Sequence, residues 1–215
     1  MDEGLSQKPR LRGVSHQWAC VVFVGLAALL IALASGAREL VGAATFAGAL
    51  VAMFGTSAVY HRVNWRSLAA RMWLRRLDHA MIFVLIAGTY TPFALLALEG
   101  AWSWSILSVV WAGALAAIGV GLAWVGAPKW LSAALGILLG WLGIVVLPQL
   151  VDAIGLLGTL LLGVGGVLYT FGAVVYARRR PDPVPAVFGY HELFHACVIA
   201  AAACQYVAVA MLVAS

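Results

Sequence analysis

The sequence has 215 residues, of which 64% are hydrophobic (AVILMFWYC) and only 10% are charged. With a mean hydropathy of +1.01, this composition excludes a water-soluble surface, so the lipid bilayer must be the solvent of the chain. The net charge of +5 does not indicate a nucleic-acid partner, because the basic residues are sorted by loop in a way typical of membrane proteins.

Apolar runs long enough to cross a membrane recur along the whole chain. A hydrocarbon core of roughly 30 Å takes about 20 helical residues to cross. We therefore predict an all-α integral membrane protein, a bundle of seven transmembrane helices with no separate soluble domain. The predicted spans are Trp18–Ser35, Leu40–Tyr60, Leu77–Leu98, Ser103–Val125, Trp130–Val151, Ala153–Tyr176 and Phe188–Val213.

The Lys and Arg residues predict the orientation of these spans. If the N-terminus is cytoplasmic, every Lys and Arg except Arg38 falls on the cytoplasmic side, as the positive-inside rule requires. The C-terminus then lies on the outer side. We predict a cytoplasmic basic N-terminal segment (residues 1–17) and a seven-transmembrane domain (residues 18–215) in the inner, or plasma, membrane, with membrane lipids as partners. Alternatively, the first apolar stretch is a cleaved signal peptide, which leaves six spans and the same charge pattern.

Ionisable residues at the span ends gather in one leaflet of this predicted topology. His61 ends the second span, Asp78 opens the third, and His191 with His195 occupies the first turns of the seventh. All three helix ends are cytoplasmic in the orientation given by Lys and Arg alone. Membrane proteins keep such groups where they find partners, so these residues form the candidate site.

The spacing of the histidines favours a metal centre. His191 and His195 are four residues apart and so share one face of a helix. Two imidazoles leave a tetrahedral zinc ion in need of a third protein ligand and an open position for water, and His61 is available at the same depth. Asp78 is placed to orient a ligand or to handle the proton of the water. The alternative is that the H-x-x-x-H pair is merely interfacial histidine.

Two further histidines, His79 and His16, are not expected to bind the metal. His79 follows Asp78 and lies about 100° further round the helix, so it is expected to face a neighbouring helix or the lipid headgroups. His16 precedes the first span and is expected to be a solvated residue.

Three motifs in this order carry a resemblance to a known family. They are Ser57-Ala-Val-Tyr-His61, Leu77-Asp78-His79 leading to Ile86-Ala-Gly-Thr-Tyr-Thr-Pro92, and His191-Glu-Leu-Phe-His195. The chain resembles the bacterial hemolysin III proteins, the prokaryotic branch of the progestin and adipoQ receptor family, and more distantly the alkaline ceramidases. The match extends over nearly the whole chain in span count, orientation and motif order.

The resemblance implies a zinc ion bound by His61, His191 and His195, with Asp78 close to the water on the metal. It also implies a role for Ser57, one turn before His61, as a supporting or oxyanion-side hydroxyl. The alternative for Ser57 is a hydrogen bond to its own helix backbone. Eukaryotic relatives are linked to hydrolysis of the ceramide amide, whereas the bacterial branch is named for lysis of red cells.

The favoured functional hypothesis is a zinc-dependent hydrolase of a lipid-like amide or ester, with Asp78 as general base or acid. A second enzymatic hypothesis takes His191 to His195 as the zincin pattern H-E-x-x-H, in which Glu192 is the base. A non-enzymatic alternative is a sensor or regulator of membrane lipid state, in which zinc only ties helices together. The family name suggests a pore-forming cytolysin, but spans of a resident membrane protein argue against it.

Overall fold

The computed structural model describes residues 9–124 and 126–215, which form seven α-helices and one short 3-10 helix. The fold is all-helical, as the apolar composition predicts, because a chain in lipid must satisfy its backbone hydrogen bonds within each segment. Residues 1–8 of the predicted basic N-terminal segment, Lys8 among them, lie outside the described residues. The elements are α1 (Val14–Ala32), α2 (Ala37–Arg62), α3 (Leu68–Leu96), α4 (Gly100–Ala123), α5 (Lys129–Gly140), η1 (Trp141–Val146), α6 (Leu147–Arg178) and α7 (Tyr190–Val213).

Six helical stretches among the described residues are long and apolar enough to cross a membrane. Five of them are single helices, and the sixth is the continuous 50-residue stretch Lys129–Arg178, which contains α5, η1 and α6. The chain is therefore a multi-pass membrane protein by helix length and composition. The predicted count of seven crossings depends on how this long stretch is divided.

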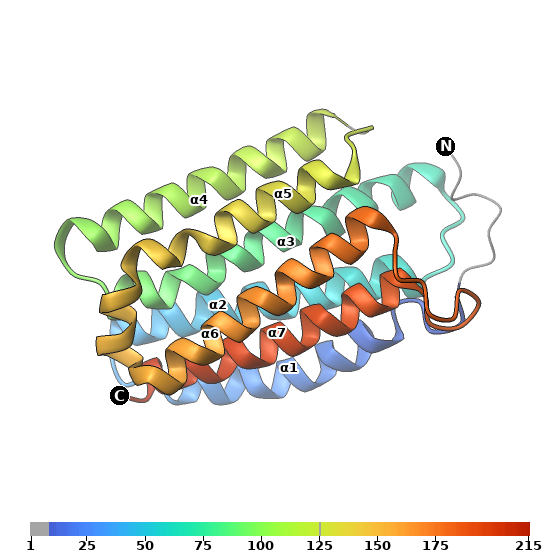
Figure 1. Ribbon diagram of the computed structural model, residues 1–215. Helices are drawn as coiled ribbons and strands as arrows, with labels where there is room; N and C mark the ends of the chain where they lie inside the picture. The colour runs from blue at the N-terminus through green and yellow to red at the C-terminus, as the bar shows by residue number, and fades with distance from the viewer. Residues whose placement is uncertain (1–8, 125) are drawn as a thin grey trace.

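The long stretch bends back on itself, so that α5 and α6 lie side by side (Figure 1). The α-helical pattern stops at η1, and Pro148 then stands in the first turn of α6. Proline is tolerated there because the first N–H groups of a helix have no partner within the helix. A second interruption occurs at Gly155, whose φ of 66° is outside the helical region. The bend therefore spans these interruptions, rather than lying only at the predicted boundary between Val151 and Ala153.

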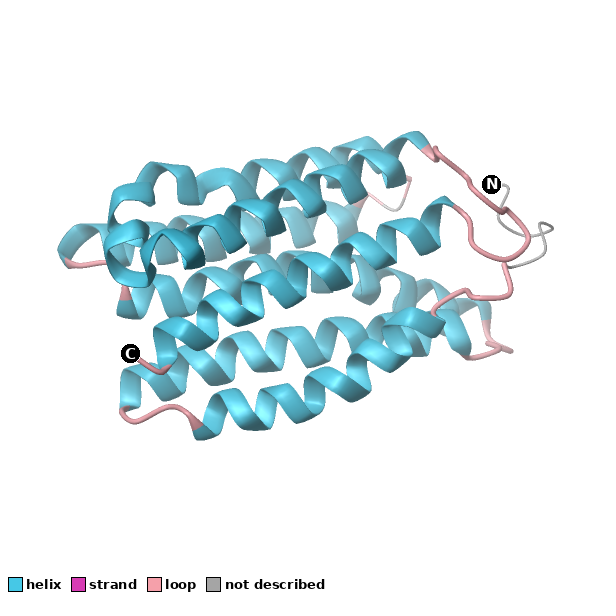
Figure 2. Cartoon of the chain, turned by 60° about the horizontal axis from the view of Figure 1, so that its bottom comes forward, coloured by secondary structure: helices cyan, strands magenta, loops and turns pink. Residues whose placement is uncertain are grey.

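Helix order brings the basic residues to one end of the bundle, which we call the basic end. The starts of α1, α3, α5 and α7 and the ends of α2, α4 and α6 lie there, and the C-terminus lies at the opposite end (Figures 1 and 2). Among the described residues, every Lys and Arg except Arg38 lies at or beside these helix ends. The charge pattern of the sequence thus corresponds to one face of the structure.

The α2, α3 and α7 helices are the most buried of the spanning helices, while the long stretch from α5 to α6 is largely exposed on the bundle surface. Small residues allow the central helices to approach closely. A Cβ added at Gly88 of α3 would lie 2.6 Å from the Ala49 Cβ of α2, and one added at Gly42 would lie 3.0 Å from the Pro92 backbone. Such contacts are how helices associate in lipid, where no hydrophobic force drives them together.

The α3 helix begins earlier than the predicted third span. Its first residue is Leu68, and the side chain of Ser67 caps it by accepting a hydrogen bond from the Ala70 N–H. Asp78 therefore does not open this helix but lies about three turns inside it. The sequence prediction missed these turns because the arginines in them end the apolar run.

Candidate metal centre

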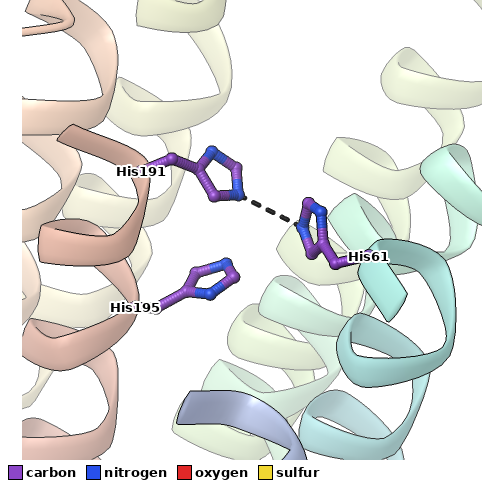
Figure 3. A group of neighbouring side chains, drawn as sticks. All are labelled: His61, His191 and His195. Carbon is purple, nitrogen blue, oxygen red and sulfur yellow. Dashed lines mark hydrogen bonds between the residues drawn. The ribbon is translucent and has the colours of Figure 1, made fainter. Parts of the chain in front are cut away.

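Three histidines from two helices meet near the basic end (Figure 3). His61 is in the last turn of α2, and His191 and His195 are in the first two turns of α7, as the sequence predicts. One ligand nitrogen from each ring lies within 4.8 Å of the other two. The Nε2 atoms of His61 and His191 are 3.2 Å apart. These side chains form the one cluster of potential metal ligands of this kind among the residues described.

The distance between the His61 and His191 nitrogens fits a tetrahedral transition metal such as zinc, and the ligand nitrogens of all three rings lie within 4.8 Å of one another. Zn–N bonds of roughly 2.0–2.1 Å place two ligand nitrogens about 3.3–3.4 Å apart, close to the distance between His61 and His191. His195 is only 2% exposed, and its Nδ1 atom is buried without a hydrogen-bond partner among the described residues. Buried polar atoms are rarely left without a hydrogen-bond partner. A cation bound to the His195 ring would supply the partner that the described residues do not.

Asp78 lies beside this cluster, from a third helix. Its Oδ2 atom is 3.7 Å from Nε2 of His61, and its side chain is 15% exposed. The Ser57 hydroxyl is a hydrogen-bond partner of Asp78. Asp78 does not belong to the cluster of mutually close ligand atoms, so it stands at the edge of the site, where a carboxylate can orient a ligand or accept a proton.

His16 is part of the site, which corrects the prediction that it is solvated. It lies in the first turn of α1 and is 2% exposed. Its ring stacks on that of His195 with centroids 3.6 Å apart and planes inclined by 13°. Its Nδ1 shares a 2.8 Å hydrogen bond with Ser57 Oγ, while its Nε2 is buried without a partner in the described part of the chain. Ser57 thus links His16 to Asp78, rather than serving only its own helix backbone.

The segment before α1 holds these groups in place. The backbone N–H groups of Arg10 and Leu11 donate to the carbonyls of Ala186 and Val187 in the loop before α7. Gly13 follows with φ of 75°, a left-handed conformation that favours glycine. A Cβ on Gly13 would lie 2.5 Å from the His61 Cβ. We call residues 9–13 the N-terminal strap, because they connect the start of α7 to His61.

Glu192, the acidic residue of the H-E-x-x-H pattern, makes contacts that do not suit a catalytic base. It is 1% exposed, and its Oε1 atom is 2.6 Å from the Arg12 Nε of the N-terminal strap. Its Oε2 atom accepts a 2.9 Å hydrogen bond from the Gly189 N–H at the start of α7. Both oxygens therefore serve the helix end and the strap, which argues against Glu192 as the base of a zincin.

His79 faces the neighbouring α6 helix, one of the two surroundings predicted for it. Its Nδ1 is 2.7 Å from the Arg75 carbonyl and must donate to it, so in the neutral ring Nε2 is an acceptor. The Tyr176 hydroxyl, 2.9 Å away, accordingly donates to Nε2. The pair connects α3 to α6 beside the histidine cluster, since the Tyr176 ring also packs edge-on against His191.

The site opens into a polar cavity of about 410 Å³ at the basic end, which we call the basic cavity. His61, Asp78 and His191 form part of its wall. The cavity is large enough to admit water and a polar group of a larger molecule. His61 and His191 are therefore reachable from one side, while His195 lies behind them and does not line the cavity.

Of these residues, sequence reasoning identified His61, Asp78, His191, His195 and Ser57, but it missed His16 and the N-terminal strap. A partial signal existed for the strap, because a glycine directly before a helix often marks an unusual backbone conformation. Nothing local in the sequence, however, indicates that the strap pairs with the loop before α7.

Comparisons with known proteins agree with the motifs. The profile of the family described as Haemolysin-III related matches residues 5–206. A Hemolysin-3 homolog of Bacillus subtilis (strain 168) is 29% identical over 170 residues, which cover 79% of this chain and 76% of the relative. Hemolysin-3 of Bacillus cereus is 38% identical over 104 residues, which cover 48% of each chain.

Proposed function

This chain belongs to the haemolysin-III related family, and from that premise we propose that it is a zinc-binding protein of the bacterial inner membrane that hydrolyses a lipid-like amide or ester. The observation that carries the proposal is the convergence of His61, His191 and His195 beside Asp78, with His61, Asp78 and His191 in the wall of a cavity. Three nitrogen ligands with an open approach are typical of catalytic rather than structural zinc.

The proposed topology has seven crossings with a cytoplasmic N-terminus and an outer C-terminus. The 50-residue stretch Lys129–Arg178 would be about 75 Å long as a straight helix, more than twice the core of a bilayer, and its two halves lie side by side (Figure 1). Counting it as two spans gives seven. The basic end would face the cytoplasm because Lys and Arg are disfavoured on the translocated side.

In this proposal His61, His191 and His195 hold the metal, which when bound supplies a Lewis acid that polarises a carbonyl and acidifies water. Asp78 receives the proton of the attacking water and returns it to the leaving group. Ser57 fixes the Asp78 carboxylate through its hydrogen bond, and His16 fixes Ser57. The apolar part of the substrate stays at the depth of the membrane while the reacting group enters the basic cavity.

A lipid-state sensor with purely structural zinc is the second candidate. Structural sites are usually closed by four protein ligands, whereas the cluster among the described residues has three. The Bacillus relatives are named hemolysins, but we do not carry lysis over to this chain, because its apolar helices are those of a packed, membrane-resident bundle.

The test is a metal analysis combined with a search for lipid cleavage. The purified chain should contain one zinc per protein, and mass spectrometry should detect cleavage of lipid amides or esters. Asp78→Asn should retain zinc and lose most turnover, because it removes the proton acceptor without removing a ligand. Asp152→Asn, an exposed change in α6 near the opposite end of the bundle, is the matched control and should leave both unchanged.

Two outcomes would contradict the proposal. One zinc per protein with no turnover of any lipid would favour the sensor. An activity that survives in Asp78→Asn but disappears in Glu192→Gln would show that the wrong carboxylate had been chosen as the base.

A further inference from the structure

A second space adjoins the metal centre. An apolar pocket of about 120 Å³ lies between α3, α5, α6 and α7. His79 and Tyr176 line both this pocket and the basic cavity, so their hydrogen bond stands where the two spaces meet. A ligand that occupied both would be polar at one end and apolar at the other.

The basic cavity has the charge of an anion site. Its cationic side chains are Arg12, Arg71, Arg75 and Lys129. Arg12 is committed to Glu192, but Arg71 and Arg75 are one turn apart on the same face of α3. Lys129, from the start of α5, donates to the Tyr190 hydroxyl at 3.3 Å and lies 4.7 Å from the centre of the Tyr176 ring. Cations from two helices therefore approach the junction of the two spaces.

Two carboxylates, Asp78 and Asp182, share the wall, but the four cationic side chains outnumber them. Asp182 accepts a hydrogen bond from the Tyr190 N–H, which uses it to cap the start of α7. Asp78 is held by Ser57 on the side of the metal cluster. The anion site would therefore lie toward α3 and α5, and the reacting group toward α2 and α7.

The positive-inside rule explains why basic residues lie at this end, but not why some of them line a cavity. Arg66 and Arg178 are exposed on the loop after α2 and at the end of α6, as the rule alone would place them. Arg71 and Lys129, in contrast, are partly buried in the cavity wall. Cationic side chains that line a cavity, rather than only the surface, can contact an anionic group that enters it.

The apolar pocket has the surroundings of a hydrocarbon chain. Phe83, Ile86, Ile137, Phe194 and Val198 are among the residues that line it. Glycines at positions 136, 140 and 166 leave room between α5 and α6. A further pocket of about 130 Å³ shares Tyr90, Trp141 and Gln205 with it and continues toward the other end of the bundle.

We propose that the basic cavity binds the phosphate group of an anionic lipid through Arg71, Arg75 and Lys129, while one acyl chain occupies the apolar pocket. The His79–Tyr176 pair then lies at the boundary between headgroup and chain. The bound lipid would be the substrate of the hydrolase proposed above. Cleavage of the lipid rests on that proposed function, whereas binding of the lipid does not. The basic cavity favours a phosphate-bearing lipid over a neutral one.

The test measures lipid binding to the full chain in a neutral detergent by native mass spectrometry. The probes are phosphatidylglycerol, a diacylglycerol with the same chains, and glycerol phosphate, which separate the contributions of phosphate and chain. Wild type should bind phosphatidylglycerol more tightly than either of the others. The double variant Arg71→Gln/Lys129→Gln should bind it roughly tenfold more weakly or worse, because two charge-assisted contacts are lost.

The matched control is Arg66→Gln/Arg178→Gln, which removes the same charge from the same end of the bundle but outside the cavity. It should bind like wild type, and the charge-preserving pair Arg71→Lys/Lys129→Arg should retain most of the affinity. Equal losses in the two double Gln variants would overturn the proposal, since they would indicate diffuse attraction. Diacylglycerol or glycerol phosphate binding as tightly as the phospholipid would also overturn it, the latter by pointing to a soluble phosphate compound.

The binding result is separable from catalysis. Asp78→Asn should still bind phosphatidylglycerol, because the phosphate contacts remain. A wild-type protein that binds this lipid specifically but never cleaves it would remove the hydrolase proposal and leave the lipid site in place.

Discussion

Replacement of Gly13 by alanine tests whether the N-terminal strap positions His61. Gly13 has φ of 75°, where an L-residue costs roughly 1–2 kcal/mol. The new Cβ would lie 2.5 Å from the His61 Cβ, whereas carbon atoms in contact are about 3.5–4.0 Å apart. The two must therefore separate by about 1 Å.

A shift of this size is large for a metal ligand, since metal–ligand distances in well-formed sites agree within about 0.2 Å. Because the contact is to the first atom of the side chain, rotation about the side-chain bonds cannot fully relieve it. We expect Gly13→Ala to weaken zinc binding about tenfold or more, which corresponds to roughly 1.4 kcal/mol. Competition with a chromogenic chelator measures this affinity.

Gly25→Ala is the matched control, because it makes the same change within α1 where no atom lies within 4 Å of the added Cβ. It should bind zinc like wild type and unfold at an equal or slightly higher temperature, since alanine favours helix over glycine. If Gly13→Ala binds zinc as tightly as Gly25→Ala, the strap does not position His61 or His61 is not a ligand, and the reasoning is refuted.

Three further changes test other contacts. His16→Ala should weaken zinc binding roughly tenfold and shift the absorption bands of the cobalt-substituted protein, because the ring stacked on a ligand is lost; unchanged bands would contradict this role. Arg12→Met should lower the free energy of unfolding by about 3 kcal/mol or more, measured by denaturation in detergent, because it leaves the buried Glu192 carboxylate without its cation; a stability like that of wild type would show that the ion pair is dispensable. Gly88→Ala should lower the unfolding temperature because its methyl group would force α3 away from α2, at a cost of roughly 1–3 kcal/mol, whereas Gly48→Ala, with open space around it, should not.

Much of the fold could be predicted because the bilayer imposes simple rules. Apolar runs and the distribution of Lys and Arg predict the helices and the basic end. The histidine cluster follows from the i, i+4 spacing of His191 and His195 together with His61 at the same end. The apolar runs and the histidine spacing are local properties of the sequence. The basic end depends only on which side of the membrane each loop lies.

The predictions that failed depend on contacts between distant segments. His16 is buried because the strap pairs with the loop before α7 and brings the start of α1 against His195. The bend between α5 and α6 was only roughly located because hydropathy stays high through Trp141–Val146, so composition does not mark where the helix is interrupted. Hydropathy measures which residues prefer lipid, but it does not record where a helix changes direction within it.

The separation of the histidines along the chain has a consequence for biogenesis. His61 lies near the end of the second helix, and its nearest histidine neighbour, His191, follows 130 residues later in the last one. A nascent chain emerging from the ribosome therefore cannot assemble the cluster until α7 has been synthesised and inserted. A metal bound by this cluster would be loaded among the final events of maturation, and a protein truncated after α6 would lack two of the three histidines.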